Sequence, residues 1–339
     1  MNCHNLCFPP ESATCYLGEP MCGRYASARK RTELLEEFGV ERDRVSEPLE
    51  PDYNVAPTKS VYAVLTGRPR GTGEQQDGDG AQADAAQADG ARADAAQADG
   101  VRAAPAGPAG RYAGEARELR VVRWGLVPFW AKDPKIGSRM INARAETVSV
   151  KPSFRRAFAH RRCLLPADGY YEWYRPGADA KAAKQPYYMY RADGSSLALA
   201  GLYELWRNRE FPDDHPDAWL WTSTIITTSA PDELGRIHDR MPMVIQPELW
   251  ADWLDPGNTD TGDLLGLMAP AGSGGLVIRP VSTAVNSVRN NGPGLIEPAE
   301  PESPGRASSG SPGEPPARSP RLPSGASRGA PGSSPDTLF

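Results

Sequence analysis

Three polar side chains lie in apolar or turn-rich stretches of the sequence. Glu172 stands among aromatic residues in GYYEW, His238 lies in a turn within RIHDRMPMVI, and Asn142 lies in MINARAET. A carboxyl group among aromatic rings loses water, which raises its pKa toward the range useful for proton transfer. Histidine titrates near neutral pH, and an asparagine amide both donates and accepts hydrogen bonds. These residues are candidates for acid–base and positioning roles; an edge glutamate and a structural histidine are the alternatives for each taken singly.

Cys22 differs from the other cysteines because of the residue before it. The stretch GEPMCGRYA places Met21 directly in front of Cys22. If translation starts at Met21, removal of the methionine leaves a terminal cysteine, which is a 1,2-aminothiol. Its α-amine has an ordinary pKa of about 7.7–8.0, so an appreciable fraction is unprotonated at neutral pH. Such an amine condenses with an aldehyde to an imine, and the thiol then closes a five-membered thiazolidine.

The remaining cysteines favour neither a disulfide framework nor a metal site. Cys3, Cys7 and Cys15 crowd the start of the chain together with His4, in a spacing that fits no standard zinc pattern. Cys163 lies in an apolar run and is predicted to be a small buried strand residue. A disulfide framework would spread its cysteines through the fold, so this distribution predicts a reducing cytoplasm. We expect no metal and no cofactor.

Short β runs dominate the elements that must position the candidate residues. A helix is expected over 28–38, with Ser27 as its cap, and another over 247–254. Strands are expected at 61–67, from 119 onward, and at 162–173, 185–191, 197–206, 219–230 and 275–282. Strands and helices do not alternate regularly. The predicted fold class is therefore α+β, with a mixed or barrel-like β core flanked by short helices.

Three segments lack the large apolar residues that a core requires. Within about 68–117, the unit AQADAAQADG is followed by its near-copy ARADAAQADG. Residues 298–339 are rich in Pro, Ser and Gly, and residues 1–21 have no periodic apolar pattern. The sequence therefore predicts one domain over 22–297, interrupted by a disordered insertion in a loop between two strands and followed by a disordered tail. We expect residues 1–21 to be absent from the working protein.

Charge is distributed unevenly along the chain. The net charge of the 339 residues is −5, which by itself argues mildly against nucleic acid. Between 132 and 162, however, nine basic residues face only Asp133 and Glu146, so this window carries +7. A local basic patch is what phosphate binding requires, although such runs are also found on ordinary solvated surfaces. No apolar run is long enough to cross a membrane, and the first residues do not resemble a secretory signal.

Several stretches together resemble the SRAP family of SOS-response-associated peptidases and HMCES-like proteins. They are MCGRYA, YNVAPT, RWGLVPFW, INARAET, RCLLPADGYYEW, HDRMPMVI and VNSVRNNGPGLIEP, in family order. The resemblance implies a protein that binds single-stranded DNA and cross-links covalently to the ring-opened aldehyde of an abasic site through a terminal cysteine. It implies Cys22 as the nucleophile, Asn142 as a positioning residue, Glu172 as general acid–base, and His238 in ring opening, proton transfer and reversal.

The same resemblance implies a set of DNA contacts and a cellular setting. The expected phosphate or base contacts are Arg24, Asn54, Pro57, Trp124, Arg144, Arg161 and Arg162, with Pro57 and Trp124 stacking or wedging against bases. We expect a monomer in the cytoplasm, associated with the nucleoid, whose partners are abasic single-stranded DNA and replication-fork components.

Two departures from the family pattern keep other functions open. Twenty residues precede Met21, and a leader that remained attached would block thiazolidine chemistry; the loop between two strands is also enlarged. One alternative is a thiol peptidase in which Cys22 is the nucleophile, His238 is the base, and the leader is removed by self-cleavage. Another is a DNA-binding module without chemistry, for which the basic window alone would suffice.

Overall fold

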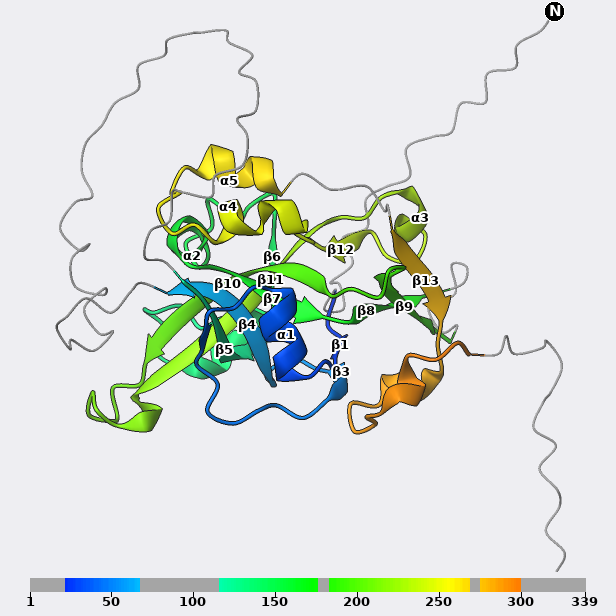
Figure 1. The fold of residues 1–339 in the computed structure, drawn as a ribbon, viewed down its shortest axis with the longest axis horizontal. Helices are drawn as coiled ribbons and strands as arrows, with labels where there is room; N and C mark the ends of the chain where they lie inside the picture. The colour runs from blue at the N-terminus through cyan, green and yellow to red at the C-terminus, as the bar shows by residue number, and fades with distance from the viewer. Residues whose placement is uncertain (1–21, 68–115, 176–182, 269–274, 300–339) are drawn as a thin grey trace, which may run out of the picture. The chain divides into compact units, whose positions relative to one another are not determined.

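A computed structural model describes residues 22–67, 116–175, 183–268 and 275–299 (Figure 1). The expectations for 1–21, for most of 68–117 and for 300–339 lie outside the described residues. The elements form a mixed α+β fold, as the sequence predicts. The helix expected over 28–38 is shorter, at α1 (Arg31–Glu37), because Ser27 ends strand β1 and Lys30 is the N-cap. The 162–173 run is two strands, divided at Asp168.

Five strands close into a barrel. Strand β4 pairs with β5 and β7, β7 pairs with β10, β10 pairs with β11, and β11 returns to β5 through a parallel pairing. Closure leaves no strand edge unpaired along this ring. The barrel strands are β4 (Ser60–Gly67), β5 (Ala116–Trp124), β7 (Arg162–Ala167), β10 (Leu197–Arg207) and β11 (Trp219–Ser229).

A second sheet of five strands continues from the barrel through the β7–β8 connection. The chain bends at Asp168, whose amide donates to the Ala26 carbonyl and whose carboxylate accepts the Ala28 amide at 2.6 Å. The sheet order is β13 (Leu276–Pro280), β9 (Gln185–Arg191), β8 (Gly169–Tyr174), β1 (Tyr25–Ser27) and β3 (Asp52–Val55). Figure 1 shows these strands beside the barrel. Strand β1 thus carries the residues after Cys22 against β8, which holds Glu172.

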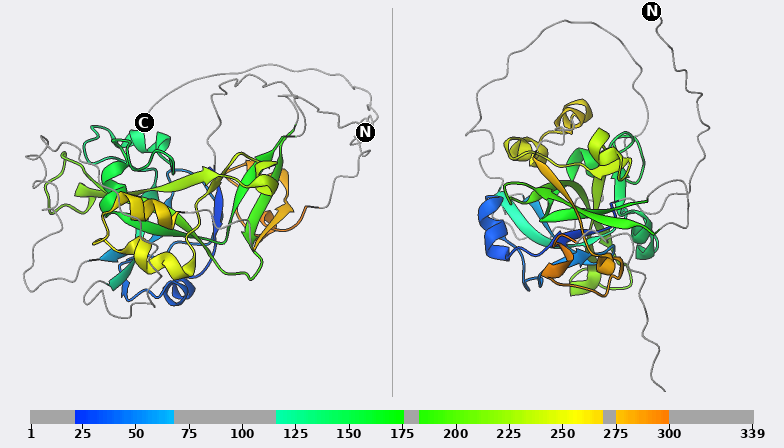
Figure 2. Two further views of the ribbon diagram at one scale, coloured as in Figure 1. Left: turned by 90° about the horizontal axis from the view of Figure 1, so that it is seen from above. Right: turned by 90° about the vertical axis from the view of Figure 1, so that its right-hand side faces the viewer.

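Strand β7 explains how the two apolar clusters divide. All six of its residues are buried, and after Arg162 the strand is a continuous apolar run rather than an alternating one. Cys163 and Leu165 point into the cluster inside the barrel, whereas Leu164 belongs to the cluster under the helices. The helical layer, visible on the barrel in Figures 1 and 2, consists of α1, α2 (Arg155–His160), α4 (Trp250–Leu254) and α5 (Thr261–Leu267). The short helix α3 (Asp232–Gly235) follows β11.

Strand β11 brings distant segments together at its C-terminal half. On one edge it pairs first with β5 and then with β6 (Asn142–Arg144), both in parallel. On the other edge it pairs with β10 and then with β12 (Arg240–Pro242). The segment with Asn142 therefore pairs with Ile225–Thr227 of β11, and the segment that follows His238 pairs with the residues from Thr227 to Ser229, so the two meet at Thr227. The two-residue strand β2 (Arg42–Asp43) pairs in parallel with Glu118 and Leu119 of β5.

The pairing of β4 and β5 yields a prediction about the segment between them. Gly67 lies opposite Ala116 in an antiparallel register, so the two ends of residues 68–115 are already at hairpin distance. Replacing 68–115 with an Asn-Gly turn is expected to leave the melting temperature within a few degrees, because a tight hairpin turn fits this register. Thermal unfolding followed by circular dichroism measures the change. A loss of cooperative unfolding would show that the replaced segment contributes to the fold.

Candidate active site

Cys22 and Glu172 are in direct contact at the start of the described chain. The Cys22 backbone nitrogen donates to Oε1 of Glu172 at 2.9 Å. Antiparallel pairing of β1 with β8 sets up this contact, since Tyr25 lies opposite Tyr170 and the Tyr171 amide donates to the Arg24 carbonyl. Cys22 and Glu172 are each only 3% exposed. A carboxylate thus reaches the nitrogen of the candidate nucleophile in a site that excludes most water.

Burial changes the acid–base behaviour of both groups. Loss of water raises the pKa of Glu172 above its ordinary value, while the nearby charge of His238 and the hydrogen bonds from Cys22 lower it in part. Burial, with the charge of Glu172, raises the pKa of the Cys22 thiol well above its ordinary range. The thiol therefore stays protonated at neutral pH, and Glu172 is shifted toward the range of a proton-transfer group.

Two groups lie at Nδ1 of His238. The backbone N–H of Arg240 donates to it at 3.0 Å, which favours a neutral ring with its proton on Nε2. The carboxylate of Asp239 lies 3.0 Å from the same Nδ1 and would accept a proton carried there, so the two neighbours favour opposite tautomers. His238 lies near enough to Glu172 to affect its pKa. The site thus joins a carboxyl, a thiol, an imidazole and the nitrogen of Cys22, with the partly buried Asn142 on β6 across β11.

Arg240 is a site residue that sequence reasoning did not select. It is 8% exposed, and it donates to both carboxylate oxygens of Glu146 at 2.5 and 3.0 Å and to the Thr227 carbonyl at 2.6 Å. Its charge works against the rise in the pKa of the Cys22 thiol. The side chain therefore ties the segment after Asn142 to the segment after His238. Its position two residues after His238, in an otherwise apolar strand, was the available signal.

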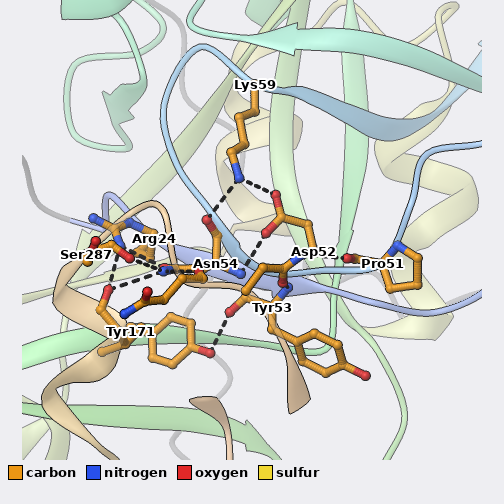
Figure 3. Close-up of polar contacts among 11 residues, drawn as sticks. Arg24, Pro51, Asp52, Tyr53, Asn54, Lys59, Tyr171 and Ser287 are labelled. Atoms are coloured by element: carbon orange, nitrogen blue, oxygen red, sulfur yellow. Dashed lines mark hydrogen bonds and ion pairs between the residues drawn. The ribbon is translucent and has the colours of Figure 1, made fainter. Parts of the chain in front are cut away.

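Arg24, which is partly exposed, and Asn54 bind the backbone of the segment 285–290 (Figure 3). Asn54 is fully buried; its Oδ1 accepts Nη1 of Arg24 at 2.7 Å. Its Nδ2 donates to three backbone carbonyls, those of Val285, Ser287 and Asn290, at 3.3, 3.0 and 2.9 Å. The guanidinium of Arg24 also lies 5.6 Å from the ring centre of Trp173, next to Glu172. Arg24 and Asn54 therefore make hydrogen bonds within the protein, whereas the sequence analysis expected them to contact DNA.

Trp124, Arg161 and Arg162 also differ from their expected roles. Trp124 is completely buried, packs edge-on against Tyr25 at 5.2 Å and donates its indole N–H to the Ile141 carbonyl, so it cannot stack on a base without leaving the core. Arg161 is paired with the buried carboxylate of Glu204. Pro57, in the turn after β3, is half-buried, and Arg144 is exposed at the end of β6. Among the residues expected to bind DNA, Arg144 is exposed, and Arg24, Pro57 and Arg161 are partly exposed.

Arg162 is a structural cation. Its guanidinium donates to the carbonyls of helix α2, helix α4 and the following turn, including Phe158 at 2.8 Å, Trp253 at 2.7 Å and Asn258 at 3.0 Å. Burial lowers its pKa to about 10, so it remains charged at neutral pH. It therefore holds three segments of the helical layer on strand β7.

Removing this side chain is expected to destabilise the fold strongly. Arg162→Ala leaves several buried carbonyls without donors, and we expect a loss of about 3 kcal/mol in the free energy of unfolding. Urea denaturation measures it, with the exposed Arg155→Ala as the matched control, for which a change within about 0.5 kcal/mol is expected. Equal stability of the two variants would refute the structural role.

Two features of the described ranges bear on function. No group of three or more His, Cys, Asp or Glu side chains there could hold a metal ion. None of the helices described is long and apolar enough to cross a membrane. The cluster of Cys3, His4, Cys7 and Cys15 lies outside these residues.

Comparison with known proteins places the chain in a family. The model of the SOS response associated peptidase (SRAP) family matches residues 21–288, so this protein belongs to the SRAP family. It is 35% identical over 277 residues to the abasic site processing protein YoqW of Bacillus subtilis strain 168, covering 82% of this chain and 99% of that protein. It is 34% identical over 199 residues to the abasic site processing protein HMCES of Xenopus tropicalis, covering 52% and 56%.

A solved structure supports the fold independently. A crystal structure of a protein from Bordetella bronchiseptica aligns with a TM-score of 0.51 at 23% identity, covering 77% of this chain and 100% of that one. At this level of identity the likeness concerns the fold alone.

Proposed function

We propose that this protein processes abasic sites in single-stranded DNA by forming a covalent cross-link through Cys22. The observation that carries the proposal is the 2.9 Å contact between the Cys22 nitrogen and the buried Glu172 carboxylate. In a chain that begins at Cys22 this nitrogen is an amine, and the carboxylate is placed to accept its proton. The names of the relatives, abasic site processing proteins, agree with an aldehyde-bearing abasic site as the substrate.

The reaction balances with the groups present. The free amine adds to the aldehyde carbon of the ring-opened sugar, and loss of water from the carbinolamine gives an imine. Glu172 takes the proton from the ammonium and returns it to the departing hydroxyl, a double role that suits its raised pKa. The thiol then adds to the imine carbon and its proton passes to the nitrogen, which closes the thiazolidine. A protonated thiol is adequate for this step, because the imine is the electrophile.

Two neighbouring residues complete the proposed mechanism. His238, which lies near Glu172, is suited to protonate the ring oxygen as an imidazolium when the abasic sugar opens. Asn142 would orient the sugar or the amine from the other edge of β11. Arg144, exposed at the end of the same short strand, would bind a phosphate.

Backbone geometry supports a chain that begins at Cys22. With Met21 attached, Cys22 has a φ of +48°, a left-handed conformation that costs a non-glycine residue about 1–2 kcal/mol. In a chain that starts there, no preceding carbonyl opposes this conformation. An amide nitrogen also cannot form an imine. We therefore propose that residues 1–21 are absent from the working protein, most simply because translation starts at Met21.

The thiol peptidase is less well supported than the cross-linking function. Such an enzyme needs a thiolate, which a neighbouring cation stabilises. Here burial and the carboxylate of Glu172 raise the pKa of the Cys22 thiol, and the charge of Arg240 lowers it only in part. The site therefore favours amine chemistry, assisted by a carboxylate, over thiolate attack on a peptide.

A single assay separates the three functions. The chain beginning at Cys22 is incubated with single-stranded DNA that carries one abasic site, and the products are denatured by heat and resolved by electrophoresis. A heat-stable shifted band supports the proposal. A plain binder gives no covalent band. A peptidase also gives none, and it instead cleaves a peptide added to the same reaction whether or not the aldehyde is present.

A further inference from the structure

Tyr170 lies on the same face of strand β8 as Glu172. Successive side chains of a strand point to opposite faces, so Tyr170 and Glu172 share one face, while Tyr171 lies on the other. The apolar clusters agree with this division, because Tyr170 packs with the barrel interior and Tyr171 packs in a separate cluster. In the pairing of β1 with β8, Tyr170 lies opposite Tyr25, three residues after Cys22. The side chain of Tyr170 therefore points to the side of the sheet on which Glu172 meets the nitrogen of Cys22.

The hydroxyl of Tyr170 has no hydrogen-bond partner among the described residues. The side chain is 1% exposed, and its oxygen is buried. A buried polar group without a partner destabilises the folded state, and a phenylalanine would fill the same space without that cost. Such groups are uncommon in native proteins. The Tyr170 hydroxyl is thus free to bind a group that enters from outside, such as part of a substrate.

Two groups of the candidate site lie near this hydroxyl. Burial raises the pKa of Tyr170 well above its ordinary value, and the charges of Cys22 and Glu172 raise it further. The phenol therefore keeps its proton at neutral pH and is a hydrogen-bond donor. All three side chains are buried, so a substrate atom that reaches the Cys22 nitrogen enters surroundings with little water.

The addition step of the proposed reaction requires a donor of this kind. When the amine nitrogen adds to the aldehyde carbon, the electron pair of the carbonyl double bond moves to oxygen, and negative charge develops there. A donor held in place where water is excluded stabilises that charge. Glu172 holds the proton of the ammonium until the hydroxyl departs, so a different group has to donate to the oxygen during the addition.

We propose that the Tyr170 hydroxyl donates a hydrogen bond to the aldehyde oxygen of the substrate while the Cys22 amine adds to the carbonyl carbon. The proposal rests on the proposed function for the amine chemistry. Tyr170 transfers no proton: its O–H bond stays intact, and the oxygen leaves as water after Glu172 protonates it. The phenol thus contacts the reacting atoms and complements the acid–base role of Glu172.

Tyr25 offers a matched control. Its hydroxyl is also buried and also has no partner among the described residues, and it lies opposite Tyr170 in the strand pairing. The charges that act most on the pKa of Tyr25 are those of Asp52 and Cys163, whereas Tyr170 is affected by the groups of the candidate site. Tyr25→Phe and Tyr170→Phe therefore remove the same atom from similar surroundings, and only the second change removes it beside the reacting amine.

Cross-linking rates of the chain that begins at Cys22 test the proposal. Single-turnover rates with abasic single-stranded DNA are measured for the wild type and both variants, together with the affinity for an intact strand. We expect Tyr170→Phe to react about 100-fold more slowly with unchanged affinity, the lower end of the loss when one donor to a developing oxyanion is removed. Tyr25→Phe should react like the wild type. A wild-type rate in Tyr170→Phe, or an equal loss in Tyr25→Phe, would overturn the proposal.

Thermal stability separates this role from a structural one. Neither hydroxyl has a partner among the described residues, so neither phenylalanine variant should lower the melting temperature. A drop of several degrees in Tyr170→Phe alone would show that its hydroxyl supports the fold, and would overturn the proposal.

The Cys22→Ala variant isolates the step at which the hydrogen bond acts. It keeps the amine but has no thiol, so it stops at the imine, which borohydride traps. Adding Tyr170→Phe to this variant should slow formation of the trapped adduct by about 100-fold, because the hydrogen bond to the oxygen precedes ring closure. If the effect of Tyr170→Phe disappears without the thiol, the hydroxyl acts on the sulfur and the proposal is wrong.

Free 2-deoxyribose distinguishes failure of this proposal from failure of the proposed function. The sugar carries the same aldehyde without DNA, and intact mass reports its thiazolidine with Cys22. If the wild type forms no adduct with abasic DNA but Tyr170→Phe still slows the reaction with deoxyribose, the proposed function is wrong and the hydrogen bond stands. If the DNA adduct forms equally fast in the wild type and in Tyr170→Phe, the hydrogen bond is wrong and the cross-linking function stands.

Discussion

A chain that begins at Cys22 should form a heat-stable adduct with abasic single-stranded DNA, whereas a chain with one glycine in front of Cys22 should form none. The glycine converts the nitrogen beside Glu172 from an amine to an amide, which cannot form an imine. Its thiol can still add to the aldehyde, but the resulting hemithioacetal reverses on denaturation. The expected effect is therefore complete loss of the covalent band on a denaturing gel, with intact mass confirming each terminus.

Cys22→Ala and Cys22→Ser separate the roles of the amine and the thiol. Both variants keep the amine, so both should form an imine that borohydride reduction traps as a stable amine adduct. Neither should match the untreated wild type in heat stability, because alanine cannot close a ring and the serine hydroxyl is a weaker nucleophile than the thiol. A heat-stable adduct from Cys22→Ala without reduction, or from the full chain with residues 1–21 attached, would refute the thiazolidine.

The second large effect is expected at Glu172. Glu172→Gln keeps an oxygen that can accept the hydrogen bond from the Cys22 nitrogen, but it cannot transfer a proton. We expect cross-linking to slow by about 10²–10⁴-fold, the usual contribution of an acid–base group, with unchanged affinity for intact DNA. Single-turnover cross-linking rates measure the effect. A wild-type rate in this variant would assign Glu172 a structural role only.

The same substitution should change stability in a pH-dependent way. Burial raises the pKa of Glu172 above its ordinary value of 4.5, so on raising the pH the unfolded chain loses this proton before the folded chain does. The folded state then binds more protons than the unfolded state, and stability falls as pH rises from about 4.5 through the raised value. In the full chain, the melting temperature of Glu172→Gln relative to wild type should therefore increase across this window and then level off. A relative melting temperature that decreases would contradict the raised pKa.

Local pattern was sufficient for much of the architecture. The strand at 185–191 is predicted with its observed bounds, and the strands at 61–67 and 197–206 differ from β4 and β10 by one residue. These runs have apolar or aromatic side chains with β propensity, and their partners do not alter that preference. The start of α1 was missed because pairing of β1 with β3 keeps Ser27 in the sheet. Strand pairing between distant segments decided where α1 begins. The residues around Ser27 are, by themselves, compatible with a helix cap at that position.

In the candidate site, too, some features followed from the sequence and others only from the tertiary structure. Residue type and local surroundings alone indicated a candidate aminothiol at Cys22, a carboxyl among aromatic rings at Glu172, and a basic window, because each depends on neighbours in the sequence. The direction of an arginine or tryptophan side chain could not be determined in this way. Arg162 and Trp124 point inward because closure of the barrel and the helical layer over β7 cover them. Lys132, Lys135 and Trp130 remain outside because two glycines close the base of the loop between β5 and β6, which carries them. The sequence thus determined which chemical groups the protein possesses, and only the tertiary structure decided which of them meet and which face solvent, since contacts between distant segments depend on strand pairing and burial.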